Sequence, residues 1–176
     1  MKLNFVFNTD KIQESIGIVS EFLPDLKSSG MYHYFPFSDD DLKSGDALRV
    51  KIVRDIEQFH LGNVLKQLQE YWEAHEGEIN EVLSEYLARE KLSILPSYTC
   101  ALTFYGPYGY YHTPDIVYLN ITKRTTEFTI QTLLHEFLHL VLFERVKDLP
   151  DKEVETIIDK TFVEIFGKIF LNYYTQ

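Results

Sequence analysis

The alternation of apolar and polar residues near the start of the chain predicts one strand followed by one helix. Within residues 2–8, the apolar residues Leu3, Phe5 and Phe7 stand at every second position, which is the period of a strand with one buried face. Apolar residues then recur at helical spacing over residues 11–23, and Pro24 is expected to end that helix. Residues 24–46 are rich in serine, aspartate and glycine, so we expect a loop with short pieces of structure.

The middle of the chain predicts a long helix-rich block over residues 47–92. Its charged residues have the spacing of solvated helix faces. Gly62 and Gly77 are the expected breaks between helices, because glycine lowers helix stability.

The second half of the chain predicts two strands and then two helices. Alternating patterns over residues 98–105 and 115–121 indicate strands that form a hairpin or lie as neighbours in a sheet. A helix capped by Thr125 or Thr126 is expected to run to residue 146, and a last helix runs from the following short connection to about residue 173.

These elements predict an α+β fold with a small mixed sheet packed on helices. No stretch of the chain has the composition of a linker, so we expect a single domain over residues 1–176. Within it, residues 47–92 form the additional helical block, and residues 98–174 form the sheet and the last two helices.

The first of the two C-terminal helices contains the motif HEFLH, in which His135 and His139 flank Glu136 at the spacing HExxH. Histidines four residues apart differ by about 40° around a helix, so both imidazoles project from one face and can bind one metal ion. Zinc suits imidazole nitrogen, and Glu136 lies at the edge of that face, where it can accept a proton from a metal-bound water. HExxH arises by chance in about 2% of random sequences of this composition, so other residues have to support it.

The last helix offers the third ligand that such a site needs. Glu155 and Asp159 fall on its broad apolar face, bracketed by Phe162 and Phe166, where an unpaired carboxylate is costly. We therefore predict Glu155 as the third ligand of one zinc ion per chain, and Asp159 as the acceptor for the free N–H of His135. Two alternatives stay open: the histidines belong to an ordinary buried helix, or the carboxylates lie at a helix edge that reaches solvent or a lysine.

Charge and cysteine content narrow the class of protein. The chain has 27 acidic and 17 basic residues and a net charge of −10, which disfavours nucleic acid and anionic membranes as partners. Its one cysteine, Cys100, cannot form an internal disulfide, and no apolar run is long enough for a signal peptide or a membrane helix. We expect a soluble, cytoplasmic protein.

Together, HEFLH at 135–139 and ETIID at 155–159 resemble the gluzincin metallopeptidases, which are the thermolysin-like zincins. The short spacing between the two motifs is similar to that of compact, minimal gluzincins. No HExxHxxGxxH continuation follows, which sets the metzincins aside. The resemblance implies a zincin-like fold and the same roles for five residues: zinc ligands His135, His139 and Glu155, general base Glu136, and supporting acceptor Asp159.

The resemblance also implies a cleft in which a strand preceding the HExxH helix binds extended substrate. Residues 115–121 occupy that place in the chain order. The expected substrate contacts are Tyr110, Tyr111, His112 and Tyr118. The residue that stabilises the oxyanion has no motif match, and the candidates are Tyr110, Tyr111, His112, Tyr173 and Tyr174.

The function expected from the sequence is therefore zinc-dependent hydrolysis of peptide bonds in a peptide or protein substrate. Two alternatives stay open. One is a zincin-fold binding or regulatory module that keeps zinc but has little hydrolytic activity. The other is a metal-free helical domain in which HExxH is accidental.

Overall fold

The computed structural model describes residues 1–58, 62–122, 124–171 and 173. This part of the chain forms an α+β fold of six helices and one four-stranded mixed sheet. Each of its helices is too short or too polar to cross a membrane. In chain order the elements are β1 (Lys2–Val6), α1 (Thr9–Ser29), α2 (Asp39–Lys43), α3 (Gly45–Gln58), α4 (Gly62–Glu90), β2 (Ser97–Thr103), β3 (Gly109–His112), β4 (Ile116–Asn120), α5 (Thr126–Val146) and α6 (Asp151–Phe166).

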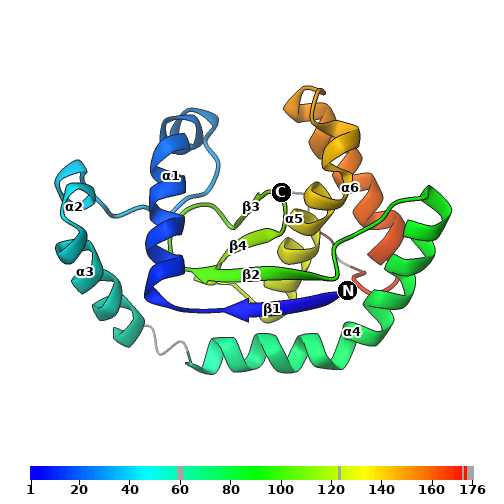
Figure 1. The fold of residues 1–176 in the computed structure, drawn as a ribbon, viewed down its shortest axis with the longest axis horizontal. Helices are drawn as coiled ribbons and strands as arrows, with labels where there is room; N and C mark the ends of the chain where they lie inside the picture. Colours follow the sequence, from blue (N-terminus) through cyan, green and yellow to red (C-terminus); the bar gives the residue numbers. More distant parts are fainter. Residues whose placement is uncertain (59–61, 123, 172, 174–176) are drawn as a thin grey trace.

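The strands lie in the order β1-β2-β4-β3, so β3 is at one edge of the sheet (Figure 1). β1, β2 and β4 are parallel, and β3 runs antiparallel to β4. The two predicted strands in the second half are confirmed as sheet neighbours, but they do not form a hairpin. The chain reverses direction twice, once into β3 and once out of it, and this makes β4 parallel to β2. The sequence prediction missed β3, because four residues are too few for an alternating pattern to stand out.

Helices cover both faces of the sheet. On one face, Ser15 of α1 donates a hydrogen bond to Thr103 of β2 (3.3 Å). On the other face, the ring of Tyr98 of β2 meets Phe137 of α5 edge-on, with centroids 4.9 Å apart. α5 packs on β3 and β4, and it is flanked by α4 and α6. The HEFLH helix therefore lies in the middle of the fold.

α4 runs alongside β1 and closes that side of the sheet (Figure 1). Asn80 donates a side-chain hydrogen bond to the carbonyl of Met1 (3.3 Å), and Trp72 packs edge-on against Phe5 (6.5 Å between centroids). α4 also contacts α5 and α6. Within the predicted helical block, α4 therefore packs against the HEFLH helix.

Pro24 does not end α1, contrary to the sequence prediction. The helix continues for one more turn to Ser29 and ends at Gly30, which has a positive φ of 72°. Proline removes one hydrogen bond from the helix, but Leu26 beyond it is buried, at 3% exposure. The apolar contact of Leu26 holds the last turn in place. The predicted loop of residues 24–46 also contains α2.

Gly77 does not break α4 either, whereas α4 does begin at Gly62 as predicted. The helix continues through Gly77 because it buries a continuous face that includes Trp72 and Ile79. The last helix, α6, is shorter than predicted and ends at Phe166. Residues beyond it turn back toward the helix, where Phe170 is buried.

Replacing Gly77 by alanine is expected to raise the free energy of unfolding by about 0.5–1 kcal/mol. Gly77 is exposed inside a helix, and an added Cβ would meet no atom within 4 Å. Urea denaturation followed by circular dichroism measures the change. Gly17→Ala in α1 is the matched variant, because its Cβ also enters open space. A loss of stability in both variants would contradict the prediction.

Candidate metal centre

α5 is buried on all sides along its middle. Thr125 caps it, accepting a hydrogen bond from the backbone N–H of Phe128 (3.2 Å). Residues 129–139 are then buried without interruption. Its two histidines and Glu136 therefore lie in the protein interior, where polar groups need partners.

Two imidazole nitrogens and the two carboxylate oxygens of Glu155 converge at the surface of α5. Nε2 of His135 lies 3.2 Å from Nε2 of His139 and 3.3 Å from Oε2 of Glu155. Nε2 of His139 lies 3.4 Å from Oε1 of Glu155. Ligand atoms around a tetrahedral metal with bonds of about 2.0–2.1 Å are about 3.3–3.4 Å apart. The three residues are thus arranged as ligands of one metal ion, as the sequence predicts.

Glu155 comes from α6, which begins at Asp151 after a short connection and packs against α5. Its side chain is 48% exposed, whereas His135 and His139 are buried. Partial burial raises the pKa of Glu155, but hydrogen bonds and charge from the two histidines lower it more, to about 2. The open side of the cluster is therefore the side of the glutamate, where solvent or a ligand can enter.

Asp159 lies beside His135 as predicted, with its Oδ1 3.6 Å from Nδ1, but the hydrogen bonds between them pass through Tyr173. The hydroxyl of Tyr173 donates to Oδ1 of Asp159 (2.6 Å) and lies 2.7 Å from Nδ1 of His135. The hydroxyl of Tyr173 has one hydrogen, which it donates in the hydrogen bond to Asp159. Its oxygen therefore acts as the acceptor of a hydrogen bond from the N–H at Nδ1 of His135. With a proton held on Nδ1, a neutral His135 has its lone pair on Nε2, which is the tautomer that a metal ligand needs; without a metal, a second proton on Nε2 can bond to Glu155.

Packing fixes Tyr173 in this position. Its ring stacks on Phe162 of α6 with centroids 3.9 Å apart, and burial together with the bond to Asp159 raises the pKa of its hydroxyl. His139 is held differently. Its ring stacks on Tyr111 of β3 (4.9 Å), and within the described residues its Nδ1 is buried without a hydrogen-bond partner.

Glu136 lies next to the cluster and under the edge strand. It is 7% exposed, and this burial raises its pKa to about 7. Gly109 at the start of β3 makes room for it, because a Cβ there would lie 2.8 Å from Cγ of Glu136 and 2.6 Å from Thr132. A residue with a side chain at position 109 would push against the carboxylate.

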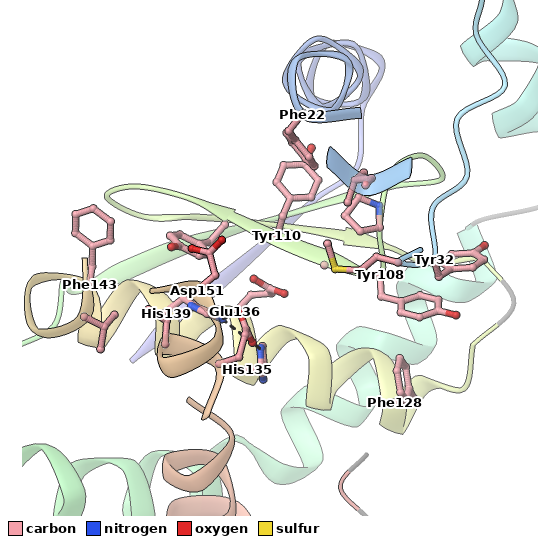
Figure 2. Close-up of a pocket in the computed structure, with 18 of the residues that line it drawn as sticks. Phe22, Tyr32, Tyr108, Tyr110, Phe128, His135, Glu136, His139, Phe143 and Asp151 are labelled. Carbon is pink, nitrogen blue, oxygen red and sulfur yellow. Dashed lines mark hydrogen bonds and ion pairs between the residues drawn. The ribbon is translucent and has the colours of Figure 1, made fainter. Parts of the chain in front are cut away.

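A cleft of about 1080 Å³ passes over His135, His139 and Glu155, which are called the metal cluster below. Its walls are α5, β3 with the turn before it, the second half of α1 with the segment after it, and the start of α6. His135, Glu136 and His139 lie in the middle (Figure 2). Tyr32, Tyr108 and Phe128 form one end, and Phe143 lies at the other end (Figure 2).

Two of the four predicted substrate contacts line this cleft. Tyr111 stacks on His139, and its pKa is raised by burial and by the negative charges of Glu136 and Glu155. Tyr110 lines the cleft as well, but its hydroxyl donates to Ser15 of α1 (2.7 Å).

The other two predicted contacts lie elsewhere. Tyr118 is fully buried on the α1 face of the sheet, where its hydroxyl donates to Glu14 (2.5 Å). His112 is exposed at the end of β3 and is not among the residues that line the cleft. Tyr174, one of the oxyanion candidates, lies outside the described residues.

Sequence reasoning missed the roles of Tyr173 and Gly109. Gly109 carried a signal, because a glycine beside a strand pattern often marks a close approach. Tyr173 carried none, since it lies 38 residues from His135 in an irregular segment with no periodicity.

Comparisons with known proteins do not extend these observations. No protein-family model matches the chain, and no curated protein sequence and no solved structure matches it either.

Replacing Tyr173 by phenylalanine is expected to weaken the binding of a divalent metal about 10- to 100-fold. The ring keeps its stacking on Phe162, but His135 and Asp159 lose the hydroxyl that joins them. Competition with a chromophoric chelator, using Zn²⁺ as the probe, measures the affinity. Tyr34→Phe is the control, because Tyr34 lies outside the cleft and its hydroxyl has no hydrogen bond among the described residues. Equal affinities in the two variants would show that the hydroxyl does not orient His135.

Proposed function

We propose that the chain is a zinc-dependent metallopeptidase with a zincin-like fold. The observation that carries the proposal is the convergence of His135, His139 and Glu155, with each imidazole Nε2 3.3–3.4 Å from a different carboxylate oxygen and the two nitrogens 3.2 Å apart, beside the buried carboxylate of Glu136. Two nitrogens and one carboxylate oxygen suit zinc. Three protein ligands with an exposed side leave a position for water, as catalytic zinc sites require.

The order of elements supports the same proposal. A strand precedes the HExxH helix, and the next helix supplies the glutamate and Asp159, which is similar to the arrangement that the motifs imply for gluzincins. The difference lies in the contact to His135, which here passes through Tyr173.

Each residue of the site then has a role in hydrolysis. Zn²⁺ held by the three ligands would lower the pKa of a bound water to about 7. Glu136 accepts the proton of the attacking water and gives it to the leaving amine. Tyr111, which stacks on His139 and faces the cleft, is the candidate donor to the oxyanion.

The edge strand offers a place for the peptide substrate. The carbonyl of Tyr108 accepts a hydrogen bond from Asn120 on the β4 side. Because this pattern repeats at every second residue of an antiparallel pair, the backbone groups of Gly109 and Tyr111 face the open edge. An extended peptide can add to that edge as a further strand. The strand expected from the sequence, residues 115–121, cannot take this role, because β4 has neighbours on both sides.

Purified protein is expected to contain close to one zinc ion per chain, measured by elemental mass spectrometry. Glu155→Ala is expected to lower the zinc affinity at least about tenfold, because it removes one of three ligands. Glu153→Ala is the matched control, since Glu153 is exposed on the same helix and is not part of the cluster. An absence of zinc even after dialysis against zinc salts would mean that the histidines serve packing alone.

Replacing Glu136 by glutamine is expected to lower peptide cleavage at least about 100-fold while zinc stays bound, because the amide cannot accept a proton. Cleavage of a mixed peptide substrate, followed by mass spectrometry with and without a zinc chelator, measures this. Cleavage by Glu136→Gln at the wild-type rate would refute its role as the base. Zinc binding without any chelator-sensitive cleavage by the wild type would favour a zinc-retaining binding module instead.

A further inference from the structure

One end of the cleft carries an arginine held between aromatic rings. The guanidinium carbon of Arg124 lies 3.7 Å from the ring centroid of Tyr108 and 4.1 Å from that of Phe128. Tyr32 covers the ring of Tyr108 in a parallel stack, with centroids 4.2 Å apart and planes 8° apart. All four residues line the cleft.

This stack holds the guanidinium without using its hydrogen-bond donors. The rings of Tyr108 and Phe128 stand at 79° to each other, so they contact the guanidinium from two directions, and neither ring supplies a lone-pair acceptor for its five N–H groups. In the part of the chain that the structure describes, no hydrogen bond or ion pair connects Arg124 to an acceptor. Arg124 is therefore a positioned donor with its edge available to a ligand.

None of the acidic residues that the structure describes forms an ion pair with Arg124. Glu127, three residues further along, accepts a hydrogen bond from Gln131 (3.4 Å). The other cation that lines the cleft, Lys147, differs, since it forms an ion pair with Glu144 (2.6 Å). The chain has a net charge of −10, so an unpaired cation inside its cleft is a local exception that attracts an anion.

The distance from this end to the metal cluster fits a peptide. Phe128 precedes His135 by seven residues on α5, which corresponds to about 10 Å along the helix. An extended chain advances about 3.3 Å per residue, so 10 Å corresponds to about three residues. Figure 2 shows Phe128 and Tyr108 at one end of the same cleft that contains His135 and Glu136.

We propose that Arg124 forms a subsite for a carboxylate on the peptide substrate, about three residues from the cleaved bond. The carboxylate belongs either to an acidic side chain or to the C-terminus of the peptide, since a planar guanidinium binds both in the same paired geometry. This proposal rests on the proposed function for the position of the cleaved bond. It deepens that function by naming an anionic group as a determinant of specificity.

The test uses the zinc-loaded full chain and a random-sequence peptide mixture. Peptides that contain the cleaved sites, found by mass spectrometry, are synthesised as matched pairs. In one kind of pair a glutamate is replaced by glutamine, and in the other a free C-terminus is replaced by an amide. The same pairs are titrated against zinc-loaded Glu136→Gln, so that binding is measured without cleavage. The variants are Arg124→Gln, Arg124→Lys, which keeps the charge but not the planar fork, and Arg49→Gln, an exposed residue of α3 outside the cleft.

We expect the acidic member of a pair to be cleaved and bound about 10- to 100-fold better than its neutral partner. Arg124→Gln is expected to abolish this preference, Arg124→Lys to keep part of it, and Arg49→Gln to keep all of it. The pair that responds identifies the source of the carboxylate, either the side chain or the C-terminus.

The failures of the two proposals differ in this experiment. Cleavage or binding with the same selectivity in wild type and Arg124→Gln would overturn the subsite and leave the peptidase intact. Binding that depends on Arg124 and on the peptide carboxylate, without chelator-sensitive cleavage by the wild type, would overturn the peptidase and leave the subsite intact. If zinc-loaded protein neither binds nor cleaves any peptide of the mixture, both are wrong.

Discussion

The burial of three polar side chains on α5 is the constraint on which the rest of the site depends. His135, Glu136 and His139 lie on a helix that is buried without interruption over residues 129–139. Unpaired imidazoles and carboxylates in such a place cost several kcal/mol in total, on the order of 1–3 kcal/mol each. The surrounding elements offset part of this cost, because α6 brings Glu155 to both histidines and Tyr173 bonds to His135. Tyr111 of β3 only stacks on His139, whose Nδ1 has no hydrogen-bond partner among the described residues.

The segment after α6 ties metal binding to the folding of the chain beyond its last helix. Phe170 is buried and Tyr173 stacks on Phe162, so this segment packs on the same helix that carries Glu155 and Asp159. A metal ion held by His135 would therefore stabilise the packed position of Tyr173, and that packed position would in turn favour metal binding. The two equilibria are linked, although Tyr173 is not itself a ligand.

The sheet shapes the cleft through one short strand. β3 is four residues long, yet it turns the chain so that β2 and β4 are parallel, and it forms the free edge above α5. Its two faces have different tasks. Gly109 and Tyr111 lie toward α5, whereas Tyr110 points toward Ser15 on α1. This alternation explains why only part of the predicted aromatic set lies at the metal cluster.

The sequence by itself determined what depends on local spacing: a helix cap at Thr125 or Thr126, the HEFLH face of α5, and the face of α6 that carries Glu155 and Asp159. These follow from helical periodicity, which acts over a few residues. It also predicted an α+β fold and most of its elements. Only the tertiary structure decided that α1 continues past Pro24, that β3 forms the sheet edge beside β4 and so lets β4 run parallel to β2, and that the hydroxyl of Tyr173 bonds to both His135 and Asp159. In each case the cause is a contact between segments far apart in the chain, such as packing around Leu26 or Phe162, and no local pattern encodes such a contact.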